Sequence, residues 1–134
     1  MELVLSGILY LETNILNYLL EDHKQHSVKV AQILDDYTKA NDNSLLTSAV
    51  AITEFLAGTV SSSLETLHKI PRLIFKALDE TLAEQAGSLQ RQNSLQIGDA
   101  IHLAMSISVG SELFFTNDKQ LAKVASKYMV IKSL

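Results

Sequence analysis

Short apolar runs alternate with longer segments of helical periodicity along the whole chain. The aliphatic and aromatic run Leu3–Leu11 predicts a buried strand in its second half, Ile8–Leu11. Comparable short runs predict further strands at Leu45–Thr47, Leu113–Phe115 and Tyr128–Ile131. Strands that alternate with helices are typical of a three-layer α/β/α sandwich with a mostly parallel central sheet. We therefore expect this fold class.

Helices are predicted where apolar residues recur at helical spacing. The predicted helices are Ile15–Leu20, Val28–Ala40, Ala49–Ala57, Asp79–Gln92, Ile97–Val109 and the segment that follows Asp118. The helix Ile97–Val109 is apolar on nearly every side, which predicts a buried position. Glu21–Ser27 is expected to be a polar connection and Thr59–Lys69 a surface loop, whereas Ile74–Leu78 fits either a helix or a strand.

Length and composition favour one soluble globular domain. The 134 residues are 47% apolar and 19% charged, so we expect residues 1–134 to form a single domain with its own core. No apolar run reaches the ~18 residues of a membrane span, and the N-terminus does not read as a secretory signal. Cysteine is absent, which excludes disulfide and thiolate chemistry and favours a cytoplasmic location. The net charge of −4 argues against a generic nucleic-acid coat, but it allows an enzyme that handles a polyanion through metal ions.

Four carboxylates stand beside apolar elements, where acids are uncommon. Glu12 follows the first strand, and Asp118 lies just past the strand that ends at Phe115. Asp99 lies in the first turn of an apolar helix, and Glu54 is the only charge in its helix. The carboxyl ends of parallel strands meet at one edge of a sheet, so these side chains are expected to converge there. Carboxylates are rarely buried unless they are paired or bind a metal, so the sequence predicts a cation site at this edge.

Four short motifs carry these acids in a fixed order. They are YLETN at Tyr10–Asn14, S-x(5)-E ending at Glu54, GDAIHLA beginning at Gly98, and FTND ending at Asp118. Their order and spacing resemble the PIN-domain family of metal-dependent ribonucleases, which includes the VapC-like toxins of bacterial and archaeal toxin–antitoxin pairs. The resemblance extends from about Leu3 to Ile131, which is nearly the whole chain.

The resemblance implies a centre of four acids that hydrolyses RNA phosphodiester bonds. The family's acidic quartet matches Glu12, Glu54, Asp99 and Asp118, and its polar helpers around the metals match Thr13, Asn14 and Thr116. It also implies one or two Mg²⁺ or Mn²⁺ ions, which are hard cations that take oxygen ligands. The expected direct ligands are Glu12, Asp99 and Asp118, with Glu54 either a further ligand or a residue that positions the attacking water. By the same resemblance, the expected partners are an RNA substrate, an antitoxin protein and a second copy of the chain in a homodimer.

One residue departs from the family's usual motif. The first acid is normally an aspartate in a D-T-N or D-T-S context, and here it is Glu12. The extra methylene moves the carboxylate unless the backbone retreats, and a misplacement of ~1 Å can lower a rate by about 100-fold. Glutamate still ligates Mg²⁺, so two functions stay open: an active ribonuclease, and a catalytically impaired PIN-like binding module.

Other functional classes lack their motifs in this chain. A phosphoacceptor receiver domain requires an acidic pair after its first strand, and Glu12 has no acidic neighbour. No G-x-G-x-x-G supports dinucleotide binding, and no G-x-S-x-G supports a serine hydrolase. His102 follows Asp99 on the same side of its helix, and we expect it to be a packed residue that is hydrogen-bonded to backbone or to an acid.

Basic residues form two groups that would contact RNA phosphates or form solvated faces. They are Lys119, Lys123 and Lys127 along the last predicted helix, and Lys69, Arg72 and Lys76 if their segment is helical. The first group is the better candidate for RNA binding because it begins beside Asp118.

Overall fold

The computed structural model describes residues 7–20, 24–58 and 64–134, in which strands and helices alternate. The strands are β1 (Ile8–Leu11), β2 (Ser44–Ser48), β3 (Leu73–Lys76), β4 (Leu113–Phe115) and β5 (Val130–Lys132). The helices are α1 (Thr13–Leu20), α2 (Lys24–Lys39), α3 (Val50–Gly58), α4 (Leu64–His68), α5 (Glu80–Asn93), α6 (Ile97–Ser108) and α7 (Lys119–Ala125). All strand pairs are parallel, in the order β3-β2-β1-β4-β5, which confirms the predicted fold class. None of the helices in these ranges combines the length and the hydropathy of a membrane span.

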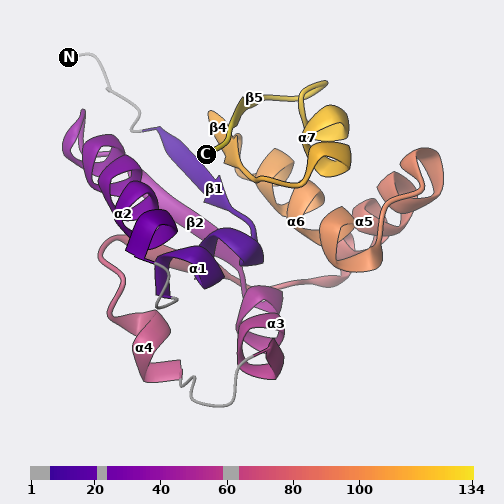
Figure 1. The fold of residues 1–134 in the computed structure, drawn as a ribbon. Coiled ribbons are helices and arrows are strands. Elements are labelled where there is room, and N and C mark those ends of the chain that lie inside the picture. Colours follow the sequence, from indigo (N-terminus) through magenta and orange to yellow (C-terminus); the bar gives the residue numbers. More distant parts are fainter. Residues whose placement is uncertain (1–6, 21–23, 59–63) are drawn as a thin grey trace, which may run out of the picture.

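Two hydrophobic cores lie on opposite faces of the sheet. Successive residues of β1 alternate between them: Tyr10 enters the core formed with α5, α6 and α7, whereas Leu9 and Leu11 enter the core formed with α1, α2 and α3. Figure 1 shows α5, α6 and α7 on one side of the central strands, and α1, α2 and α4 on the other. Because both faces are covered, β1 is apolar without interruption.

The connections of the strands place a topological switch point between β1 and β4. From β1 the chain passes through α1 and α2 to β2, its neighbour on one side. From β4, the neighbour on the other side, the chain passes through α7 to β5 at the edge of the sheet. Since α1 and α7 pack on opposite faces, the carboxyl ends of β1 and β4 lie where the direction of winding reverses. Ligands of open α/β sheets bind at such switch points.

The structure corrects the predicted start of the second helix. The segment Glu21–Ser27 was expected to be a polar connection, but α2 begins at Lys24, and residues 21–23 lie outside the described ranges. Gln25 and His26 in the first turn of α2 are exposed, and the first fully buried residue of the helix is Val30. Such a turn lacks the apolar spacing by which helices are recognised in a sequence.

Three further segments differ from the predictions or decide between alternatives. The helix α4 falls inside the predicted surface loop Thr59–Lys69, where Leu67 is fully buried; residues 59–63 are not described. Within Ile74–Leu78, which fitted either a helix or a strand, the first three residues belong to β3, because β2 provides a parallel partner for them. The helix α6 is buried over much of its length, as predicted, although Ile97 at its start is 72% exposed.

Candidate active site

Glu12 leaves β1 and turns back over the N-terminus of α1. Its Oε1 accepts the backbone N–H of Asn14 at 3.0 Å, as a capping side chain does, and the residue is only 3% exposed. Burial is the main cause that raises the pKa of Glu12 to about 7, followed by the charge of Asp99. The hydrogen bond from Asn14 opposes this rise, while the charges of Asp118 and Glu54 add to it. The fold therefore brings the predicted quartet of acids into one electrostatic neighbourhood.

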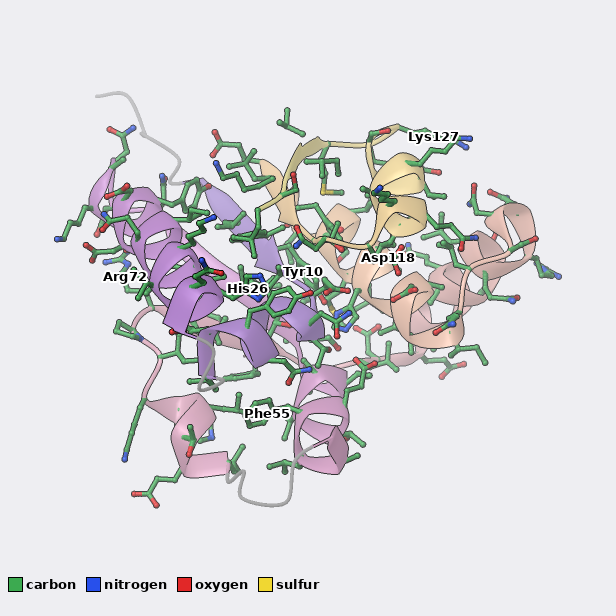
Figure 2. The ribbon with its side chains drawn as sticks, viewed as in Figure 1. Tyr10, His26, Phe55, Arg72, Asp118 and Lys127 are labelled. Atoms are coloured by element: carbon green, nitrogen blue, oxygen red, sulfur yellow. The ribbon has the colours of Figure 1, made fainter. Side chains whose placement is uncertain are left out.

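Asp118 follows β4 and caps the N-terminus of α7. Its Oδ1 accepts the backbone N–H of Leu121 at 3.0 Å. The hydroxyl of Thr116, a fully buried residue, accepts the backbone N–H of Asp118 at 3.0 Å. Thr116 thus fixes the turn that presents Asp118 at the start of α7, where Figure 2 labels it.

Asp99 lies in the first turn of α6, as predicted, and is partly buried. Burial raises its pKa most, and the charge of Asp118 raises it next. His102 lowers the pKa of Asp99, and Glu54 raises it. The charges of Asp118 and Glu54 therefore both act on Asp99, at the first turn of α6.

Glu54 reaches the same region from α3. Its Oε1 accepts the hydroxyl of Thr13 at 2.7 Å and lies 2.8 Å from Nε2 of His102. The hydrogen bond with His102 is the largest cause that lowers the pKa of Glu54; burial opposes it and Thr13 supports it. The carboxylate is therefore ionised at neutral pH and held by the protein, although the side chain is 39% exposed. The prediction that His102 is hydrogen-bonded to an acid is confirmed.

The polar residues of the first motif contribute in different ways. The side chain of Asn14 is exposed, and its backbone N–H binds Glu12. The side chain of Thr13 bonds to Glu54. Sequence reasoning missed Tyr10, whose hydroxyl lies 2.5 Å from Nδ1 of His102. The only available signal was a polar aromatic residue in an otherwise aliphatic strand.

The basic groups are arranged differently from the prediction. The helix α7 ends at Ala125, so Lys127 does not continue a helical stripe. Figure 2 shows Lys127 at the opposite end of α7 from Asp118. The second group is not helical either: Arg72 precedes a strand and donates hydrogen bonds to two backbone carbonyls. Lys119 is exposed and directly follows Asp118, which makes it the basic residue next in sequence to the acids.

The donors are of the type that a hard divalent cation takes, although in the described residues they do not form a closed ligand set. The converging groups are carboxylates, which Mg²⁺ and Mn²⁺ prefer as ligands, and a cation would relieve the cost of burying Glu12 among like charges. Across the three described ranges, no three histidine, aspartate or glutamate side chains are grouped so that they could hold one ion. Oxygens of Glu12 and Asp118 are instead hydrogen-bonded to backbone N–H groups. The assignment of Glu12, Asp99 and Asp118 as direct ligands stays a prediction.

Glu12→Gln is expected to stabilise the metal-free protein at alkaline pH. The pKa of Glu12 rises from 4.5 to about 7 on folding, so the charged side chain lowers the free energy of unfolding by up to about 3 kcal/mol above pH 7. Glutamine keeps an acceptor for the N–H of Asn14 and removes the charge. The midpoint of thermal unfolding in EDTA should therefore rise at pH 8.

This gain should disappear near pH 4, where Glu12 is protonated in both the folded and the unfolded chain. Glu84→Gln, on the exposed surface of α5, makes the same chemical change and serves as the control. A midpoint at pH 8 that stays constant or falls in Glu12→Gln would contradict the raised pKa of Glu12, which burial and the neighbouring acids cause.

Comparison with known proteins agrees with this geometry. The fold and site define an α/β domain with a parallel sheet and a cluster of acids at its switch point. The family model of the PIN domain matches residues 9–127. The chain therefore belongs to the PIN-domain family, as the resemblance of its motifs predicted. No curated protein sequence shows a significant match to it.

Solved structures of toxin systems share the fold over nearly their whole length. VapBC2 from Rickettsia felis, bound to a DNA fragment from its promoter, superimposes with a TM-score of 0.72 at 16% identity, covering 95% of this chain and 98% of that one. VapC20 from Mycobacterium tuberculosis, a toxin that cleaves the sarcin–ricin loop, gives 0.68 at 14% identity, with coverages of 86% and 93%. A toxin–antitoxin complex from Klebsiella pneumoniae gives 0.65 at 20% identity, with coverages of 87% and 91%. At these identities the comparison concerns the fold.

Proposed function

We propose that this chain is a metal-dependent endoribonuclease that acts as the toxin of a toxin–antitoxin pair. One observation carries the proposal: Glu12 is buried at the end of β1 and is repelled by Asp99, Asp118 and Glu54, which come from three other elements. A cluster of like charges at a switch point opposes folding, so it is typical of a site that binds a cation. Membership of the PIN-domain family supports the same function.

The site residues have different roles in the proposed reaction. Glu12, Asp99 and Asp118 would hold Mg²⁺ or Mn²⁺ through oxygen atoms that the backbone N–H groups leave free. When bound, the cation supplies charge neutralisation at the phosphodiester and lowers the pKa of water. Glu54, ionised and fixed on one oxygen, would orient the attacking water and accept its proton. Asn14 and Thr116 would support the metal ligands, through the backbone of Asn14 and the turn before Asp118.

The proposed partners are RNA, an antitoxin protein and a second copy of the chain. A toxin–antitoxin complex from K. pneumoniae is among the structures that share this fold, which supports an antitoxin. VapC20 from M. tuberculosis cleaves an RNA loop, which supports an RNA substrate. A homodimer and a cytoplasmic location complete the proposal by resemblance to the family.

A second candidate function is a catalytically impaired PIN-domain module that binds a partner. The observation that favours it is Glu12, whose longer side chain is bent back onto the N–H of Asn14. In this case the site would keep its fold and its acids but would cleave RNA slowly or not at all.

The test is RNA cleavage by the native chain with Mg²⁺ or Mn²⁺ and with EDTA. Single-stranded and structured RNAs are needed, because the acids do not define the target. Cleavage that requires the cation supports the ribonuclease. Cleavage that persists in EDTA would contradict a metal-dependent mechanism, and a failure to cleave any RNA would favour the binding module.

A further inference from the structure

His102 lies at the centre of a hydrogen-bonded cluster that connects α6 with β1, α1 and α3. The residue is 1% exposed on α6. Its Nδ1 lies 2.5 Å from the hydroxyl of Tyr10 on β1, and its Nε2 lies 2.8 Å from Oε1 of Glu54 on α3. Thr13 on α1 completes the cluster: its hydroxyl donates to the same Oε1 at 2.7 Å and lies 3.0 Å from Nε2. Four elements thus meet at one imidazole.

The chemistry of these groups determines where the hydrogens lie. The ionised carboxylate of Glu54 only accepts hydrogen bonds, so Nε2 of His102 must carry the hydrogen that lies between them. In the neutral ring, Nδ1 is then an acceptor, and the Tyr10 hydroxyl must donate to it. Glu54 therefore selects the tautomer in which His102 presents Nε2–H, and the Tyr10 hydroxyl supports this tautomer as the donor to Nδ1.

The cluster fixes one oxygen of Glu54 and sets the place of the other. Oε1 accepts hydrogen bonds from both Thr13 and His102. Oε2 lies against the first turn of α6, where a Cβ on Gly98 would come within 2.9 Å of it. The glycine therefore leaves room for the carboxylate beside Asp99. A long, partly exposed side chain that would otherwise sample several rotamers is held in one of them.

We infer that His102 is a positioning residue of this site: its Nε2–H, supported by the hydroxyl of Tyr10 at Nδ1, holds Glu54 so that Oε2 contacts the reacting water. The inference rests on the proposed function for its chemical meaning. It explains why a histidine and a tyrosine pair inside an apolar core, since packing alone requires neither a buried imidazole nor a buried hydroxyl. Loss of such supporting groups typically lowers activity by 10–100-fold.

The experiment compares two amide replacements that differ only in reach. In His102→Gln the side-chain amide nitrogen can occupy the position of Nε2, whereas in His102→Asn it reaches only as far as Nδ1. We expect kcat for RNA cleavage to fall by about 10–100-fold in His102→Asn with little change in KM, and to be largely rescued in His102→Gln. In the Glu54→Gln background, His102→Asn should cause less than about a two-fold further loss, because the two residues act as one unit.

Equal losses in His102→Asn and His102→Gln, or full additivity with Glu54→Gln, would overturn the inference and indicate a role in packing alone. Thermal unfolding of each variant separates loss of folding from loss of activity.

A spectroscopic measurement tests the inference even if the native chain cleaves no RNA. At a pH at which the ring is neutral, the ¹H–¹⁵N spectrum of the His102 imidazole in the metal-free protein should show hydrogen on Nε2 and none on Nδ1, and Tyr10→Phe should weaken this preference. A neutral ring in the native chain with its hydrogen on Nδ1 and none on Nε2 would overturn the inference. Absence of cleavage together with the expected tautomer would contradict the proposed function and leave the positioning of Glu54 supported.

Discussion

Asp99→Asn is expected to lower RNA cleavage by at least about 1,000-fold while the chain stays folded. Residues that act as one catalytic unit typically lose several orders of magnitude when a single member is removed. Asp99 lies in the first turn of a rigid helix and is coupled electrostatically to Glu12 and Asp118, which makes it central to the predicted ligand set. Asparagine has nearly the same shape and removes only the charge.

Initial rates with saturating Mn²⁺ would measure the loss, and thermal unfolding would check the fold. Because burial and Asp118 raise the pKa of Asp99, its charge opposes folding, so the variant should melt no lower than the native chain in EDTA. Asp36→Asn, which removes a charge from the exposed surface of α2, is the matched control. If Asp99→Asn retained a tenth of the native rate, Asp99 would not be a ligand and the cation site would have to be placed elsewhere.

The strands of the sheet could be predicted because both of its faces are covered. The bounds of β1 and β4 coincide with the predicted Ile8–Leu11 and Leu113–Phe115. Strands buried on both faces are continuous apolar runs, which are visible without any knowledge of the neighbours. The edge strand β3 is less buried, and only its pairing with β2 distinguishes it from a helix.

The site could be predicted in part for the same reason. Acids that follow predicted strands must meet at the carboxyl edge of a parallel sheet, so Glu12 and Asp118 could be placed from the order of elements alone. The contacts between side chains could not be placed this way. Tyr10 and His102 are 92 residues apart, and their hydrogen bond depends on how far α6 lies over β1. The residue spacing within one helix or strand does not predict such a contact between two elements.

At Glu12 the family motif and the local structure differ in the side chain that they favour. Resemblance calls for an aspartate, whose carboxylate would lie closer to β1 by one methylene. The structure accommodates the longer side chain because it bends back, and its Oε1 accepts a hydrogen bond from the backbone N–H of Asn14. Aspartate is also a good capping residue at this position, so the N-terminus of α1 should not be lost in Glu12→Asp.

Glu12→Asp is therefore expected to raise the rate of RNA cleavage by about 10–100-fold, because a carboxylate displaced by ~1 Å can cost about 100-fold. The measurement is the initial rate at saturating Mg²⁺ and at saturating Mn²⁺. Glu80→Asp, on the exposed surface of α5, is the control for the same chemical change elsewhere. Cleavage that appears only in Glu12→Asp would mean that the native chain is the catalytically impaired PIN-domain module that binds a partner. A slower Glu12→Asp would mean the reverse, that the site is built around the longer acid and that Asp99 and Asp118 are set back to receive it.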